Sequence, residues 1–478
     1  MISSSDCSAI KIDLKGKIEY DDTNIFKRLR LDSIDNRLVQ KCVVAVLKTQ
    51  KEDVDQFQKL IMSASAKSEE ELELDSKLAR DKARQTDSRY RKTEDEYQMC
   101  EPLARIFTAI ANFNLPGNCT QGPTRLFHSM DDMMLEANEP HTFRFSVPVP
   151  DFEISPCGID FSTSKLWRDR DVFGQVKSSR KQGPNAALPN TIPNIISHCA
   201  DYARLFMSGR PFMLYCTGLL IFGSQFCVGI FDRDGITFSP IHDMFTETEI
   251  FVHVIRAITH ELTIQELGFD PTVCVLSDEE TSQLTGETKG GYLSAIISHI
   301  GSNLRLWCTI GPPMWTSVSL LGRGTAVWHT SWCSSARNRE SDIYQAIQQP
   351  IEGLAKFECR GDVYFMDGKP ITVRNLRNLS SHKDLGDIDS ELKNPTPVLH
   401  RLVLATVGKP LWQYESEIEL LTGFCDALLG HKALYEQGIL HRDISAGNVL
   451  LSTAQDEKFH RFITDLDFAY VTDDMLVI

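Results

Sequence analysis

Apolar residues recur at intervals of three and four positions in the first part of the chain, the spacing of one buried helix face. This spacing predicts helices of a small N-terminal bundle over residues 25–63 and an amphipathic helix over residues 101–114, which the stretch "LPGN" ends. Residues 68–97 are charge-dense and have no glycine or proline, which favours a solvated helix or a connector. The apolar positions that support the first helices are Ile25, Leu29, Leu38, Val43, Val46 and Leu47.

A second pattern, in which strand-like runs alternate with helical ones, begins near His141. The elements that it predicts are strands near 142–154 and 167–177, a helix over 192–209, strands at 211–222, 225–231 and 235–239, and a helix over 247–267. The last two strands are joined by "DRDG", a tight turn in which Gly235 can adopt a positive φ.

One apolar run in this region is long enough to cross a bilayer. Residues 211–231 carry no charge, and a membrane span is therefore one interpretation. Gly218, Gly223 and the polar pair after it interrupt the run, and aromatic and β-branched residues flank the break. This arrangement favours two buried strands joined as a hairpin, so we expect no membrane partner.

A third region runs from about Leu304 to the end. Its predicted elements are a strand, glycine turn and strand over 316–328, a helix over 335–349, a strand and connector over 398–414, and a long helix over 416–438. The predicted fold class is therefore α+β. We expect a helical N-terminal region at 1–135, an α+β region at 136–300 and a third domain at 301–478.

Charge and cysteine content exclude several classes of protein. The formal net charge is −15, from 50 basic and 65 acidic residues, which argues against nonspecific attraction to nucleic acid or anionic lipid. The 13 cysteines have no CxxC spacing, so neither a zinc site nor a disulfide framework is indicated. The first residues have no apolar signal-peptide core. We therefore expect an intracellular protein, cytoplasmic or nuclear, without a nucleic-acid partner.

The stretch "HRDISAGNVL", residues 441–450, carries the clearest chemistry. Phosphoryl transfer needs a carboxylate beside the attacking hydroxyl and oxygen ligands for a metal ion. Asp443 would orient the nucleophile and accept its proton, and Asn448 would hold a metal ion. Asp465 in "FITDLDFAY" follows an apolar strand and would be the second metal ligand. Alternatively, both acids are ordinary turn residues.

The glycine turn in "LLGRGTAVW" is a candidate phosphate cradle made of Gly322, Arg323, Gly324 and Thr325. The two glycines let the chain bend close to a ligand and expose main-chain amides to it. A plain β-hairpin turn would have the same sequence, so this motif gains weight only from its place before the catalytic loop.

Together with "DRDGITFSP" and "LGFDPT", these stretches make residues 140–478 resemble the fungal-type protein kinases. The most similar part is residues 420–451, and "DLDFA" stands in place of Asp-Phe-Gly. The resemblance implies a protein-kinase-like fold, binding of ATP and Mg2+, and serine/threonine phosphotransfer. It also implies Asp443 as the catalytic aspartate, with Asn448 and Asp465 as metal ligands. Ser445 stands where many kinases have a lysine, as is usual in this family.

One departure from the kinase pattern concerns the small lobe. After the glycine turn, a kinase needs a hairpin and a strand with a phosphate-pairing lysine, then a helix whose glutamate holds that lysine. Here residues 326–340 run almost directly into the helix. The resemblance implies a lysine where His329 and Thr330 stand, and Glu340 is the expected helix glutamate. Lys356 and Lys369 lie beyond that helix, and we expect both to be surface residues.

The second departure concerns the large lobe, which we expect to be incomplete because the sequence ends soon after Asp467. The long helix would then lose its neighbours, and an exposed apolar face predicts instability or self-association. The side chains expected to be exposed are Leu420, Leu421, Phe424, Leu428 and Leu434.

Three functions remain open at this point. The first is an ATP-dependent serine/threonine protein kinase, impaired by the missing lysine strand and incomplete lobe, whose protein substrate the sequence does not identify. The second is a pseudokinase or scaffold that acts by binding nucleotide or protein. Phosphotransfer to a small molecule is the third, but such enzymes usually have His-Gly-Asp where this chain has "HRD".

A further motif lies upstream. Asp160 precedes a predicted strand that ends in Gln-Val-Lys, with Gln175 and Lys177. This resembles metal-dependent nuclease sites, in which one aspartate is followed by (Asp/Glu)-x-Lys. Gln175 stands where the second carboxylate belongs, and an uncharged amide is a weak metal ligand. We therefore interpret the motif as a structural remnant or a coincidence.

Overall fold

The chain forms two compact units, which consist of Met1–Asp270 with Arg377–His382 (unit 1) and Pro271–Leu376 with Lys383–Ile478 (unit 2). The computed structural model describes residues 4–68, 70–72, 74–75, 77–78, 94–115, 122–129, 150–158, 167–210, 212–275, 293–298, 305–310, 316–320, 324–333, 339–365, 367–377, 397–406, 408–452 and 461–472. The two units are sets of residues that pack together, which is a different property from the ability of a segment to fold alone. The expected division at residues 135 and 300 therefore stays a prediction.

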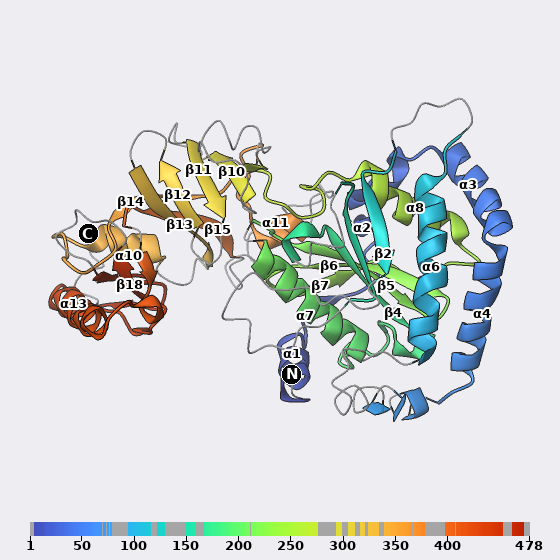
Figure 1. Cartoon of the computed structure of the whole chain (residues 1–478), viewed down its shortest axis with the longest axis horizontal. Helices are drawn as coiled ribbons and strands as arrows, with labels where there is room; N and C mark the ends of the chain where they lie inside the picture. The colour runs from blue at the N-terminus through green and yellow to red at the C-terminus, as the bar shows by residue number, and fades with distance from the viewer. Residues whose placement is uncertain are drawn as a thin grey trace, which may run out of the picture. The chain divides into compact units, whose positions relative to one another are not determined.

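Unit 1 is built around one mixed, eight-stranded sheet (Figure 1). Strands β2, β3 and β4 are antiparallel neighbours, β4 and β5 are parallel, and β5 and β6 are antiparallel. In sheet order the strands are β1 (Ile18–Glu19), β7 (Ile236–Phe238), β6 (Gln225–Phe231), β5 (Cys216–Phe222), β4 (Val172–Lys177), β3 (Phe152–Pro156) and β2 (Arg125–Ser129), with β8 (His242–Asp243) paired to β6.

Helices cover both faces of this sheet. Figure 1 shows α7 on one face and α6 on the other, where α6 packs against α4 and α8. Strands β5 and β6 are buried almost throughout, as expected for a sheet covered on both sides. The helices are α1 (Ser4–Asp13), α2 (Asn24–Arg28), α3 (Asn36–Thr49), α4 (Lys51–Ser65), α6 (Glu94–Asn112), α7 (Asn194–Gly209) and α8 (Thr248–Arg256).

The apolar run at 211–231 is the predicted hairpin. Phe222 pairs with Gln225 across the turn, and Gly223 has a φ of +61°, a value that suits glycine. Gly235 has the positive φ expected for its turn, +154°. Among the residues that the structure describes, no helix combines the length and the apolar composition that a bilayer span requires.

Several predicted boundaries in unit 1 were wrong: helix α6 begins at Glu94 and not at residue 101, and β4 begins at Val172 and not near residue 167. Strand β5 begins at Cys216 and not at residue 211, because Met213 pairs instead with Phe269 in an isolated bridge. The helix expected over 247–267 ends at Arg256 and continues as one π-helical turn, Ala257–Glu261, before Leu262 adopts an extended conformation.

Unit 2 contains a seven-stranded antiparallel sheet (Figure 1). Its strands are β14 (Phe357–Asp362), β15 (Val398–Leu404), β13 (Gly324–Cys333), β12 (Thr316–Leu320), β11 (Arg305–Ile310), β10 (Leu293–Ser298) and β9 (Val273–Val275), in sheet order. Helix α10 (Glu340–Ala346) lies between β13 and β14 in sequence, and α11 (Val373–Arg377) precedes β15. The pairing of β12 with β13 agrees with the predicted strand, glycine turn and strand.

Smaller elements complete unit 2 around the long helix α13 (Glu417–Glu436). The hydroxyl of Ser416 caps this helix by accepting a hydrogen bond from the main-chain N–H of Glu419 at 3.1 Å. The remaining strands form two small antiparallel sheets, β16 (Gly408–Pro410), β18 (Val449–Ser452) and β19 (Arg461–Ile463), and β17 (Ile439–Leu440) with β20 (Tyr470–Val471). The fold is therefore mixed α/β, consistent with a kinase-like fold.

A close main-chain contact joins α13 to the segment before β14. Gly353 has a φ of +82°, and a Cβ at Gly430 would lie 2.4 Å from the carbonyl oxygen of Gly353. No side chain fits at that distance, so glycine at position 430 permits the approach. The carbonyl of Gly353 also accepts the N–H of Ile463 at 2.9 Å, which ties this segment to β19.

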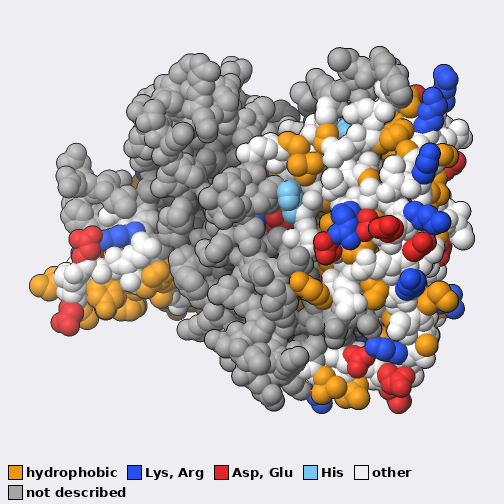
Figure 2. All heavy atoms as spheres, turned by 45° about the vertical axis from the view of Figure 1, so that its right-hand side comes forward, with side chains coloured by type: hydrophobic (Ala, Val, Ile, Leu, Met, Phe, Trp, Pro, Cys, Tyr) orange, Lys and Arg blue, Asp and Glu red, His pale blue; other side chains and the backbone are white. Residues whose placement is uncertain are grey.

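The apolar face predicted on the long helix is present in part. Leu421, Phe424 and Leu428 are 64 %, 47 % and 63 % exposed, and Figure 2 shows hydrophobic side chains gathered where α13 lies, at the lower left. The expectation was wrong for Leu434, which is completely buried, and for Leu420, which is half-buried. Both pack against the core that β17, β18 and β19 share with α10.

Candidate functional site

The loop between β17 and β18 is anchored by His441, whose side chain is completely buried. Its Nδ1 faces the main-chain N–H of Asp443 at 3.3 Å, and its Nε2 lies 3.0 Å from the carbonyl oxygen of Thr464. Because Nδ1 accepts a hydrogen bond from the Asp443 amide, the hydrogen of a neutral ring is on Nε2, which donates to the carbonyl oxygen of Thr464. His441 therefore fixes this loop to the segment after β19.

Asp443 and Asn448 contact each other within the loop. Nδ2 of Asn448 donates to the main-chain oxygen of Asp443 at 3.0 Å and to its Oδ2 at 3.2 Å. The main-chain N–H of Asn448 donates to the carbonyl of Ser445 at 3.0 Å, which closes the turn. Since Nδ2 makes both side-chain bonds, the amide oxygen is the atom of Asn448 that can bind a cation.

The main chain is strained at two positions beside these residues. Arg442 and Asp465 both have a φ of +68°, in the left-handed region that residues with a Cβ seldom adopt. Each costs on the order of 1–3 kcal/mol, and such costs occur most often at functional sites. The strain at Asp465 falls where β19 ends and the "DLDFA" segment begins.

Three carboxylates meet at this segment. Oxygen atoms of Glu340, Asp465 and Asp467 all lie within 4.8 Å of one another. Glu340 is buried at the start of α10, and its Oε1 accepts the main-chain N–H of Leu466 at 3.0 Å. Carboxylate oxygens at this spacing are the hard ligands that Mg2+ prefers, so the donor set fits a divalent cation.

Tyr344 lies one helical turn after Glu340 and is buried. Burial raises the pKa of Tyr344 well above 10, and the charge of Glu340 raises it further. The phenol therefore stays neutral beside the carboxylates. The sequence analysis missed Tyr344, His441 and Asp467. The signals available for two of them were the i, i+4 spacing of Tyr344 from Glu340 and the unusual second acid in "DLDFA".

The pairing of strand β13 shows why no separate lysine-bearing strand follows it before α10. Its first half pairs with β12 and its second half with β15, from Val327 opposite Leu404 to Cys333 opposite Val398. Only residues 334–339 separate β13 from α10, too few for a hairpin and a returning strand. The strand "GTAVWHTSWC" contains no lysine.

Other basic residues near α10 are already paired. Arg339 lies 2.6 Å from the carboxylate of Asp362, and Arg360 forms an ion pair with Asp342. Lys356 is exposed. Lys369 also lies at the surface, where it forms a 3.4 Å ion pair with Asp367.

The glycine turn is described only in part. Gly322 and Arg323 lie outside the described residues. Gly324 and Thr325 belong to β13, where they pair with Leu320 and Ser319 of β12. A phosphate-binding role for these residues therefore stays a prediction.

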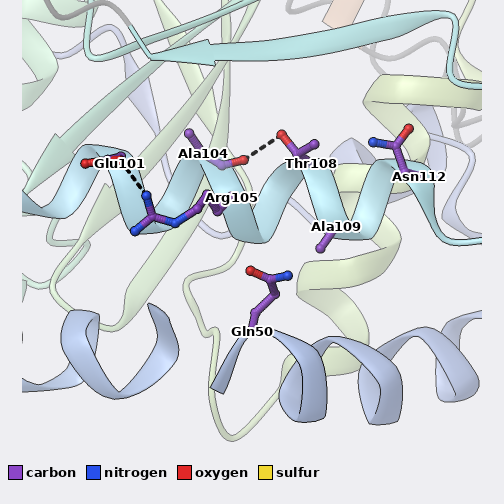
Figure 3. Close-up of a pocket in the computed structure, with 7 residues that line it drawn as sticks. All are labelled: Gln50, Glu101, Ala104, Arg105, Thr108, Ala109 and Asn112. Atoms are coloured by element: carbon purple, nitrogen blue, oxygen red, sulfur yellow. Dashed lines mark hydrogen bonds and ion pairs between the residues drawn. The ribbon is translucent and has the colours of Figure 1, made fainter. Parts of the chain in front are cut away.

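A separate surface groove lies on the outer face of α6 in unit 1 (Figure 3). Arg105 is its main charged group, and it is held by Asp53 at 2.6 Å and by Glu101 at 2.5 Å. The groove is lined by Gln50, Glu101, Ala104, Arg105, Thr108, Ala109 and Asn112. None of these residues belongs to the catalytic loop or the "DLDFA" segment, so the groove has no part in the site described above.

The antiparallel sheet, the helix α10 and the loop that contains Asp443 and Asn448 are consistent with a kinase-like fold. In a comparison with protein families, the family described as "Fungal protein kinase" matches residues 161–475. This match spans well over half of the 478 residues, so the chain belongs to the fungal protein kinase family. No curated protein matches the sequence.

Proposed function

We propose that unit 2 binds ATP with Mg2+ and transfers the γ-phosphate to serine or threonine hydroxyls of a protein, at a low rate. The observation that carries the proposal is the contact between Asp443 and Asn448, in which Nδ2 of Asn448 donates to the Asp443 carboxylate and so holds the two side chains together. The convergence of Glu340, Asp465 and Asp467 on the neighbouring segment supports it.

Each of these residues has a role in the proposal. Asp443 orients the substrate hydroxyl and accepts its proton, and Asn448 and Asp465 hold the cation. Bound MgATP supplies the phosphoryl group and neutralises charge that develops on it. Glu340 holds the "DLDFA" segment in place through the N–H of Leu466, and Gly322 with its neighbours would lie over the phosphates.

We expect a low rate because β13 contains no lysine. A lysine at this strand would normally stabilise charge on the phosphates, and removal of one such group costs about 10²–10³-fold in rate. The paired side chains of Arg339 and Arg360 do not replace it, because each already neutralises a carboxylate.

The proposal is tested with purified full chain, labelled ATP, Mg2+ and a generic protein substrate. We expect slow incorporation that Asp443→Asn abolishes and that the surface variant Asp367→Asn leaves unchanged. Incorporation that survives Asp443→Asn would contradict the proposed catalytic role.

The second candidate is a pseudokinase that binds nucleotide without transfer, and the lysine-free β13 favours it. Thermal unfolding with and without MgATP separates the two. A rise in melting temperature without ADP release indicates a nucleotide-binding scaffold. If MgATP does not raise the melting temperature and no ADP is released, nucleotide binding itself is overturned.

A further inference from the structure

Unit 1 contains a helix, three antiparallel strands, a second helix and a parallel strand, in the order α6, β2, β3, β4, α7 and β5. The upstream motif that resembles metal-dependent nuclease sites falls within this arrangement, because Gln175 and Lys177 lie on β4. A fold alone does not give a function, so the side chains at these positions decide what the site can do.

Those positions hold chemistry-bearing residues that contact one another. Asp151 directly precedes β3, and its Oδ2 accepts hydrogen bonds from Nε2 of Gln175 and from the main-chain N–H of Val176, the latter at 2.6 Å. Gln175 and Lys177 lie two residues apart on β4, so they share one face of the sheet. Nζ of Lys177 lies 2.7 Å from Oε1 of Glu96 in α6.

This geometry changes the interpretation of the upstream motif. The sequence analysis assigned Asp160 to it, but Asp160 lies outside the described residues. The aspartate that contacts Gln175 is Asp151, because β3 pairs with β4 through Phe152 and Gly174. The carboxylate that contacts Lys177 belongs to Glu96, 81 positions earlier in the chain.

A second observation points to a ligand at this cluster. Gln175 is only 4 % exposed, and its Oε1 is buried without a hydrogen-bond partner. Leaving a buried polar atom unsatisfied costs about 1–3 kcal/mol. Because Nε2 of the same amide is bonded to Asp151, the Gln175 side chain is held at this cluster. An oxygen in this place is an additional ligand for a cation.

We propose that Glu96, Asp151 and Gln175 bind a divalent cation in unit 1, with Lys177 beside it, and that this site hydrolyses phosphodiester bonds of nucleic acid. The three side chains offer carboxylate and carbonyl oxygens, the ligands preferred by Mg2+ and Mn2+. Lys177 stabilises the negative charge that grows on the phosphate oxygens.

The reaction consumes one water per bond cut. A cation-bound water loses a proton to solvent, and its oxygen forms a new bond to phosphorus. The bond from phosphorus to one ester oxygen breaks, and that oxygen takes up a proton from a second water. The products are a phosphate monoester end and a hydroxyl end, with no change in oxidation state.

The surroundings of the cluster suit this chemistry. Cys199 and Tyr202 of α7 are buried, at 0 % and 4 % exposure. A dry environment strengthens the field of a bound cation. Arg180 and Lys181 follow β4 at the surface, where they can contact the nucleic-acid backbone.

The net charge of −15 led us to expect no nucleic-acid partner. That expectation concerns long-range attraction, so we expect weak binding that is best seen at low salt.

The test uses the full chain with Mn2+ or Mg2+ at low salt and end-labelled DNA and RNA oligonucleotides in separate arms. We expect cation-dependent cleavage that EDTA stops and that Lys177→Ala lowers at least 100-fold. Lys369→Ala, a lysine exchange at the surface of unit 2, is the matched control and should leave cleavage unchanged. Absence of cleavage in both arms, or cleavage that persists in Lys177→Ala, overturns the proposal.

A second measurement keeps the test valid if Lys177→Ala does not fold. Mn2+ binding to the wild-type chain and to Gln175→Glu is followed by electron paramagnetic resonance. The added carboxylate should tighten Mn2+ binding about tenfold if position 175 supplies a ligand. An unchanged affinity overturns the assignment of the cation site.

Discussion

The main-chain N–H of Leu466 donates a hydrogen bond to Oε1 of Glu340, with 3.0 Å between the two atoms. Removing the acceptor would leave a buried N–H without a partner. We therefore expect Glu340→Ala to lower the free energy of unfolding by about 1–3 kcal/mol. Glu340→Gln keeps an acceptor oxygen and should cost less. Urea unfolding of the two variants measures the difference, and equal losses would contradict this role for the hydrogen bond.

A lysine placed on the correct face of β13 should restore nucleotide affinity. Ser331 and Cys333 share one face, since Ser331 Oγ lies 3.4 Å from Cys333 Sγ. Burial raises the pKa of the Cys333 thiol, and the charge of Asp467 adds to the shift. We expect Ser331→Lys to tighten MgATP binding about tenfold in calorimetry. Thr330→Lys, on the opposite face, is the control, and an equal gain there would contradict the assignment of faces.

Gly430→Ala should disrupt the contact between α13 and Gly353. The added Cβ would lie 2.4 Å from the carbonyl oxygen of Gly353, so the main chain must shift. We expect a loss of about 2–4 kcal/mol in the free energy of unfolding. The matched control is Gly447→Ala, because a Cβ there meets no atom closer than 3.6 Å. Similar stability of both variants would show that the close approach is not required.

The exposed face of α13 should drive self-association. Leu421 and Leu428 are both more than half exposed, at 64 % and 63 %, and exposed apolar faces of this kind associate in water. We expect Leu421→Asp with Leu428→Asp to shift the protein toward monomer in sedimentation velocity. Leu188→Asp changes a leucine that is 55 % exposed in unit 1 and is the control. A wild-type chain that is monomeric at all concentrations would contradict the prediction.

Acid should destabilise unit 1 in part through His260. Burial lowers the pKa of His260 from 6.5 to about 4, and the charge of Arg256 contributes. The folded state therefore binds the proton less readily than the unfolded state. This stability is present above pH 6.5 and is lost as the pH falls toward 4. His260→Gln should reduce the loss in the free energy of unfolding between pH 6.5 and 4, as measured by urea unfolding. His253→Gln is the control substitution.

The parts of the candidate site that lie close in sequence could be predicted. Asp443 and Asn448 are five positions apart, and one turn brings them into contact. The strand that precedes Asp465 was evident from its apolar residues. The structure brings these residues to one region of unit 2, while their roles in phosphotransfer stay proposals.

The parts that depend on distant pairing could not be predicted. Asp151 meets Gln175 only because β3 and β4 are neighbours in the sheet, and pattern analysis gives no register between strands. Glu96 reaches Lys177 from a helix 81 positions earlier. Leu434 was expected at the surface because the large lobe was expected to be incomplete, but it packs against residues of β17, β18 and β19, which the helix pattern does not reveal.

The pairing of β13 with both β12 and β15 limits how a phosphate-pairing lysine can be introduced into this chain. Both edges of the strand are occupied, by β12 over its first half and by β15 over its second. An inserted hairpin would have to take β15 away from β13 and re-pair it, which breaks several hydrogen bonds at once. A single exchange within β13 leaves both ladders whole, so point substitution is the less disruptive way to rebuild a phosphate-binding face.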